Sequence, residues 1–194
     1  MYREGIKAAK AEEIEEIINI HSIGSAASGL AAGWIPGAGG VAAVMASAGF
    51  IWSMYYRINK RLGIPIAKTI VKSLASAILT NLAGAAITLV GGAIVATALS
   101  LTGVGNVASS LIMAGLNYAV VMVSGIIYLK LLTGLFRAGK DPTNISFEEL
   151  KSEADNVIRH ENINQMLKDS KNEYIKAYKS GKVTGKESVK LEDE

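Results

Sequence analysis

The chain has 194 residues, half of them apolar and only 6% aromatic, with 20 glycines and no cysteine. The absence of cysteine excludes disulfides and cysteine-based metal sites. Positions 1–140 hold 11 basic and 5 acidic residues (+6), positions 141–194 hold 9 and 12 (−3), and the sum is the net charge of +3. No basic stripe is interleaved with aromatic residues, so the composition predicts no nucleic-acid binding.

The N-terminal part is predicted to form one helix from Glu4 to about Trp34. Its polar beginning is not typical of a cleavable signal peptide, so we expect any membrane insertion to use internal segments. In its second half, Gly29 and Gly33 belong to a series of small residues spaced four apart, which favours close helix packing. Proline and clustered glycines then end this helix within residues 35–40.

Two long runs, residues 22–56 and 73–129, contain no Asp, Glu, Lys, Arg or His. Charge is costly in hydrocarbon, whereas a helix on a soluble protein normally keeps a charged face. The two runs therefore indicate an all-α integral membrane protein. The helical part of the first run is only about 20 Å long, so it predicts a short or re-entrant hairpin, while the second run predicts a spanning hairpin.

Three further helices are predicted over Val41–Arg61, Ile66–Leu101 and Val107–Arg137. The third predicted helix of the chain carries a glycine-zipper-like ridge of small residues every four positions, which is the strongest periodic feature of the sequence. We interpret this ridge as a helix-packing surface, within or between chains, with a narrow polar-lined pathway as the alternative. The ridge consists of Ser76, Thr80, Gly84, Thr88, Gly92, Ala96 and Ser100.

Basic and aromatic residues flank the charge-free runs, as expected at a membrane–water boundary. The turn between the third and fourth predicted helices carries no charge, whereas both outer ends of that hairpin are basic. The positive-inside rule then predicts that both termini are cytoplasmic. The predicted interface anchors are Trp52, Arg57, Lys60, Arg61, Lys130 and Arg137.

The chain becomes polar after Gly139. Ser146 and Glu149 form a capping box at the start of a helix, and a second polar helix is predicted over Ile163–Tyr178. The predicted organisation is an amphipathic cytoplasmic segment, a membrane-embedded helical domain, a cytoplasmic helical segment and a disordered tail. These parts cover residues 1–21, 22–140, 141–180 and 181–194, respectively.

No catalytic, cofactor or metal site is predicted, and we expect the protein not to be an enzyme. Residues 134–140 match most of a phosphate-binding loop, but Asp141 replaces its Ser/Thr and no strand precedes it, so a helix end with a basic anchor is favoured. His21 and His160 lie far apart in sequence. An acidic cluster at Glu12, Glu13, Glu15 and Glu16 is interpreted as a solvated helix face rather than a docking site for a basic partner. Asn81 and Asn117 suit interhelical hydrogen bonds better than a pore lining.

The segment from Gly29 to Leu74 resembles the DUF697 / YcjF-like family. The matching pieces are a small-residue helix running into Ile35-Pro36-Gly37, a second helix ending in basic residues and Gly63, and a helix that opens with Lys68 and Lys72. The consensus aspartate after the turn is replaced by glycine here. The resemblance implies a bacterial membrane-associated domain, and since no GTPase motif is present, any GTPase would be a separate partner.

These patterns together predict a structural or adaptor protein of the bacterial cytoplasmic membrane. It would assemble through its small-residue ridges, as a homo-oligomer or with another protein, and present cytoplasmic helices to a partner. Two alternatives remain. One is a small pore or transporter, and the other is a soluble helical bundle whose hydrophobic hairpin inserts into the lipid bilayer on triggering.

Overall fold

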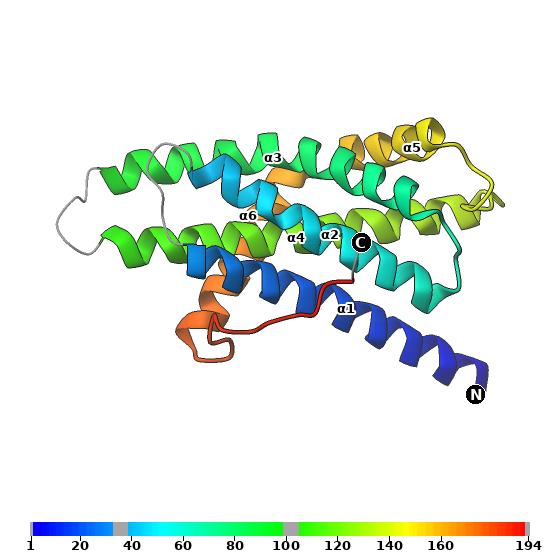
Figure 1. Ribbon diagram of the computed structural model, residues 1–194, viewed down its shortest axis with the longest axis horizontal. Helices are drawn as coiled ribbons and strands as arrows, with labels where there is room; N and C mark the ends of the chain where they lie inside the picture. Colours follow the sequence, from blue (N-terminus) through cyan, green and yellow to red (C-terminus); the bar gives the residue numbers. More distant parts are fainter. Residues whose placement is uncertain (1, 33–38, 99–104, 193–194) are drawn as a thin grey trace.

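The computed structural model describes residues 2–32, 39–98 and 105–192, and within these ranges the chain forms helices and no strand. Helices α1 to α4 run roughly along the long axis, α5 lies against one end, and α6 crosses the bundle obliquely (Figure 1). The helices are α1 (Tyr2–Ala32), α2 (Gly39–Leu62), α3 (Lys68–Ala98), α4 (Gly105–Arg137), α5 (Phe147–His160) and α6 (Ile163–Lys179). The all-helical prediction is confirmed.

Helix α4 is the centre of the bundle, because each of the other five helices packs against it. Its side chains from Met113 to Tyr128 are buried apart from the half-buried Met122 and Ile126. Among the described residues, Phe136 is the one large apolar side chain with high exposure, at 52%. The apolar composition of α4 is therefore covered by protein along most of its described length.

Helix α3 buries only one face. Val71, Leu74, Ile78 and Leu82 form its inner side and join the main core. Stretches of both α3 (Lys68–Ala86) and α4 (Ser110–Arg137) are long and apolar enough to cross a membrane. We call these two helices the apolar hairpin.

Helices α2 and α4 each end at a glycine. Gly63 closes α2 with φ of 72°, and Gly139 closes α4 with φ of 68°, a conformation that side-chain-bearing residues rarely adopt. In each case the following N–H donates to a carbonyl five residues earlier, with Lys140 N–H to Leu135 O at 2.9 Å after α4. This is the Schellman arrangement. Residues 134–140 thus form a helix end, as the sequence favoured.

The C-terminal helices join the bundle instead of forming a separate segment. Ser146 caps α5 by accepting a hydrogen bond from the Glu149 backbone at 3.2 Å, as predicted. Leu150 of α5 and Leu167 of α6 enter the main core. Both helices carry an apolar stripe on a polar background, and such a stripe requires a surface to cover it.

Residues 181–192, for which the sequence predicts a disordered tail, follow α6 without forming a further helix. They run back over α1 and α2, as the red segment of Figure 1 shows. The polar composition suggested disorder, but valine and leucine recur along the segment and contact glycines of both helices. Docking of these apolar side chains offsets the entropy lost on ordering the segment.

Candidate functional site: an apolar hairpin held among polar helices

Small residues let the surrounding helices approach the apolar hairpin closely. An ideal Cβ on Gly125 of α4 would lie 2.9 Å from Ile18 Cγ2 of α1, and one on Gly115 would lie 3.0 Å from Lys171 Cγ of α6. The first separation is shorter than real Cβ atoms show, and the second is tighter than most real Cβ contacts, so a side chain at either position would require the neighbour to shift. Glycine at these two positions therefore allows α1 and α6 to rest directly on α4.

Polar contacts connect α2 with α4 inside the core. The Tyr55 hydroxyl lies 2.5 Å from Ser124 Oγ, and the Tyr128 hydroxyl donates to Asn59 Oδ1 at 2.6 Å. The rings of Tyr55 and Tyr128 stack with centroids 3.9 Å apart. Because buried polar groups are costly when unpaired, these contacts fix one register of α2 on α4.

A directed chain of hydrogen bonds connects the tail, α2 and α1. His21 Nδ1 donates to the Ile17 carbonyl at 2.6 Å, since a carbonyl only accepts. His21 Nε2 is then the acceptor for the Ser53 hydroxyl at 3.1 Å, and Ser53 Oγ accepts the Glu192 backbone N–H at 3.0 Å. One neutral imidazole therefore holds three segments together.

The surroundings of His21 favour this neutral form. Burial lowers the pKa of His21 below its usual 6.5, and the Arg57 charge acts in the same direction. The Ile17 carbonyl and the Glu192 carboxylate oppose the shift without reversing it. Protonation of His21 would convert Nε2 from an acceptor into a donor and break the Ser53 bond.

The tail covers the part of α1 and α2 that carries no charge. An ideal Cβ on Gly24 would lie 2.7 Å from Val189 Cγ1, and one on Gly49 would lie 3.6 Å from Leu191 Cδ1. Val183 packs beside Ala26 and Tyr174 in a small apolar cluster. The ion pair of Glu192 with Arg57, at 3.3 Å, holds the end of this tail. We call residues 181–192 the strap.

The predicted packing residues separate into two groups. Gly29 is buried where α1 meets α4, and an ideal Cβ on it would lie 2.6 Å from Asn117 Nδ2. Ser76, Thr80, Gly84 and Thr88 are all exposed on the outer face of α3, and a Cβ on Gly84 would touch nothing within 4 Å. Gly33, Gly92, Ala96 and Ser100 lie outside the residues whose side chains the structure describes.

The two threonines of the exposed ridge of α3 donate their hydroxyl groups to carbonyls of the same helix. Thr80 Oγ1 donates to the Ser76 carbonyl at 2.8 Å, and Thr88 Oγ1 donates to the Gly84 carbonyl at 3.0 Å. The described part of the ridge therefore has no packing role inside one chain. It is a narrow surface that another helix can approach, and its threonine hydroxyls already donate to the helix backbone.

The predicted interface anchors have varied surroundings. Trp52 is only 6% exposed and lies under the Lys72 ammonium, 5.0 Å from the ring centroid. Arg61 pairs with Glu13 and Lys130 pairs with Glu161. Arg57 pairs with the strap, whereas Lys60 and Arg137 are exposed.

The two asparagines of the long charge-free run also differ. Asn81 Nδ2 donates to Asp155 Oδ1 of α5 at 3.0 Å, which is an interhelical hydrogen bond. The Asn117 side chain packs on Gly29, and its Oδ1 accepts no hydrogen bond from the described part of the chain.

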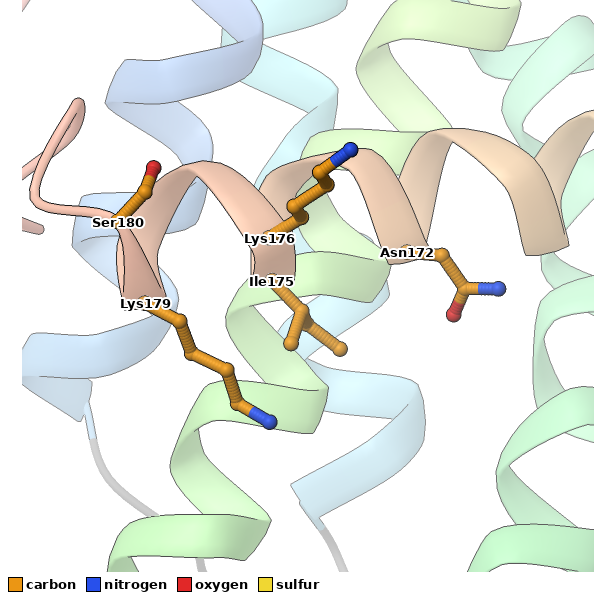
Figure 2. Close-up of a pocket in the computed structure, with 5 residues that line it drawn as sticks. All are labelled: Asn172, Ile175, Lys176, Lys179 and Ser180. Carbon is orange, nitrogen blue, oxygen red and sulfur yellow. The ribbon is translucent and has the colours of Figure 1, made fainter.

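One hollow borders α4 of the apolar hairpin, and another lies along the end of α6. The larger, about 730 Å³, lies between α1, α4 and α6; Ile14, Ile18 and Ile126 line its floor, and Glu15 and Glu173 lie at its sides. The smaller, about 420 Å³, lies under the last turns of α6 (Figure 2). Its lining residues are Asn172, Ile175, Lys176, Lys179 and Ser180.

Comparison with known proteins gave no match: no protein-family model matches the chain, and no curated protein or solved structure is similar to it. The DUF697 / YcjF-like resemblance therefore stays a prediction.

The sequence analysis did not predict that α6 packs on the apolar hairpin or that the strap packs on α1 and α2. The signal for α6 was present, because Leu167, Ser170 and Tyr174 recur at helical spacing and are the buried residues of that helix. An apolar stripe of this kind requires a partner surface, and the apolar hairpin was the largest one available.

Proposed function

We propose that this protein is a membrane-inserting helical bundle, which stores the apolar hairpin against polar helices and releases it into a lipid bilayer on triggering. Support comes from one observation: the charge-free middle of α4 is in contact with charged helices. Lys171 of α6 lies on Gly115, about 21 Å along α4 from the end of the charge-free run at Leu129.

A bilayer cannot enclose α4 while these contacts persist. A charged residue near the centre of the hydrocarbon costs about 3 kcal/mol, and α6 has charged residues along most of its length. The bundle instead covers the hairpin as a core helix is covered. Insertion then requires α1 and α6 to leave α4, so that lipid replaces their side chains.

In the inserted state, the hairpin of residues 73–129 would span the bilayer with both outer ends cytoplasmic, and residues 22–56 would follow as a short or re-entrant hairpin. The resemblance described above suggests the bacterial cytoplasmic membrane. The exposed ridge at Ser76, Thr80, Gly84 and Thr88 would then pack copies of the hairpin together, since small residues permit close helix approach in lipid.

The test uses the native absence of cysteine, which allows single labels. A T88C variant carrying an environment-sensitive dye should show a blue shift and protection from an aqueous quencher when vesicles are added. The matched S152C variant on α5, also exposed, should show neither change. An unchanged T88C signal under all conditions of lipid and pH would contradict insertion.

A crosslink between α1 and α4 tests whether the bundle must open. Gly125 and Ile18 lie close enough for an I18C/G125C disulfide. The oxidised variant should bind vesicles without insertion of the hairpin, and reduction should restore insertion. Equal insertion by oxidised and reduced protein would show that α1 need not move.

Assembly in the membrane has its own test. G84L should leave the folding of the closed bundle unchanged, because nothing lies within 4 Å of the added Cβ. It should reduce crosslinking between inserted copies. Unchanged crosslinking would remove the ridge from the assembly surface.

The hollow between α1, α4 and α6 favours a second candidate function, an adaptor that binds a basic amphipathic helix. Its apolar floor is bordered by Glu15 and Glu173, and neither carboxylate forms an ion pair within the described ranges. A 15-residue Leu/Lys helix should bind and its Leu/Glu counterpart should not. E15Q/E173Q should weaken this binding, whereas E148Q/D169Q should leave it unchanged.

A further inference from the structure

The cations of this protein are distributed in two different ways. At the end of the bundle where α2 and α4 terminate, Arg57, Arg61, Lys130 and Lys140 each pair with a carboxylate. Residues 163–192 contain seven lysines and only four acidic residues. None of these lysines forms an ion pair within the parts of the chain that the structure describes. They are Lys168, Lys171, Lys176, Lys179, Lys182, Lys186 and Lys190.

The lysines at the end of α6 border a shallow hollow. In Figure 2, the Ile175 and Lys179 side chains extend to the same side of α6, and Lys176 extends to the other side. Lys176 and Lys179 are exposed, and Ile175 is half-buried. An aliphatic floor with ammonium groups on both sides suits a ligand that has an anionic head and an apolar remainder.

The lysine-bearing helix α6 lies directly against the apolar hairpin. Lys171 and Ile175 rest on Gly115, ten residues after α4 begins at Gly105. Neither α3 after Lys72 nor α4 before Lys130 contains a charged residue. Helix α6 is thus a basic band across the middle of the charge-free part of α4.

We propose that the lysine-rich face of α6, centred on Lys176 and Lys179, binds the anionic headgroups of a lipid bilayer. This inference rests on the proposed function and names the surface that the bundle recognises before the hairpin is released. Binding here places the charge-free part of α4 beside the membrane and draws α6 away from α4 toward the headgroups.

Nucleic acid is the other polyanion that such lysines could attract. Base stacking requires exposed aromatic rings. Tyr174 is only 1% exposed and packs against Tyr118 with ring centroids 5.3 Å apart, and Tyr178 is half-buried against the same apolar cluster. With the aromatic groups turned inward, this face offers charge and aliphatic surface, which suits lipid.

The experiment measures vesicle flotation of the full chain with phosphatidylcholine alone and with added phosphatidylglycerol. We expect binding only with phosphatidylglycerol and a decrease in binding with added salt. Each lysine near an anionic surface contributes roughly a factor of 5, so K176Q/K179Q should weaken binding about 30-fold. The control K60Q/R159Q removes the same charge from exposed positions outside α6 and should bind normally.

Three outcomes would overturn this inference. They are equal binding to both kinds of vesicle, equal weakening by the two double variants, and tighter binding to a 20-nucleotide single strand than to phosphatidylglycerol vesicles. Thermal unfolding of both variants checks that the bundle remains folded.

The labelled T88C protein separates this inference from the proposed function. Flotation with phosphatidylglycerol but no dye shift would retain the lipid surface and contradict hairpin insertion. A dye shift that is equal with neutral and anionic vesicles would retain insertion and contradict the lipid surface.

Discussion

Helices α3 and α4 are similar in length and composition, yet they lie in opposite surroundings. They have 31 and 33 residues, and protein buries 39% of the membrane-length stretch of α3 but 61% of that of α4. The difference lies in which residues face outward. Protein covers α4 along most of its described length, whereas α3 exposes a face of serine, threonine and glycine.

This difference shows how an apolar hairpin can remain stable outside a bilayer. The outer face of α3 has no large apolar side chain among its described residues, and its threonines donate to carbonyls of the same helix. The same face suits water in the closed bundle and close helix packing in lipid. The inner face, by contrast, depends on protein or lipid contact.

The largest expected effect is on the free energy of unfolding, and it should differ between the inner and outer faces of α3. Leu82 is fully buried, so L82A should lower the free energy of unfolding by about 2–5 kcal/mol through loss of apolar burial and creation of a cavity. T80A on the exposed face should change it by less than about 0.5 kcal/mol. Urea unfolding measures both. Similar losses for the two variants would mean that both faces are buried.

The next prediction is that alanine changes the stability in opposite directions at two glycines, Gly29 and Gly84. G29A places a Cβ 2.6 Å from Asn117 Nδ2, and the cost of overpacking exceeds the gain in helix propensity, so we expect a net loss of about 1 kcal/mol. G84A meets no neighbour and should gain about 0.5–1 kcal/mol. Thermal unfolding should therefore shift in opposite directions. Shifts of the same sign would remove the distinction between the two packing surfaces.

A smaller effect concerns the polar contacts of α4. Y128F removes the hydroxyl that donates to Asn59 Oδ1 and leaves a buried amide unpaired, at a cost of about 1–2 kcal/mol. The control Y178F removes a hydroxyl from a half-buried tyrosine of α6 and should cost less. Equal effects in urea unfolding would mean that the Tyr128 bond contributes nothing specific.

The smallest effect is a pH dependence from His21. Because the pKa of His21 is lowered in the folded state, its contribution is complete above the usual value of 6.5. It decreases as the pH falls below 6.5 toward the folded pKa, since the unfolded chain then binds the proton first. H21Q should lose less free energy of unfolding than the wild type between pH 7.5 and 5.5, as measured by urea unfolding at each pH.

Much of this fold followed from the sequence, and what was missed has a physical cause. The ends of α1 to α4 were predicted to within a few residues because proline, glycine and charge mark them locally. The packing of α6 on Gly115 was not predicted, because it depends on a contact between distant segments that no local pattern encodes. The strap was read as disordered, since valine and leucine spaced among lysines show no helical or strand period.

The candidate site was predicted only in part. The spacing of Ser76, Thr80 and Gly84 correctly indicates one face of a helix, but spacing alone does not say whether a neighbour covers that face. Gly29 and Gly84 look alike in sequence and have opposite surroundings. Lys176 and Lys179 form no ion pair with the described residues, and the sequence could not show this because it depends on where distant carboxylates lie.

The docking of Glu192 on Ser53 sets an order of events during opening. The strap crosses both α1 and α2, so these helices cannot part while it is attached. The strap can peel away one residue at a time, whereas α1 and α2 must break many contacts at once. Force applied at the C-terminal end would therefore detach the strap in small steps. Force applied to α1 would have to break all the contacts between α1 and α2 at once.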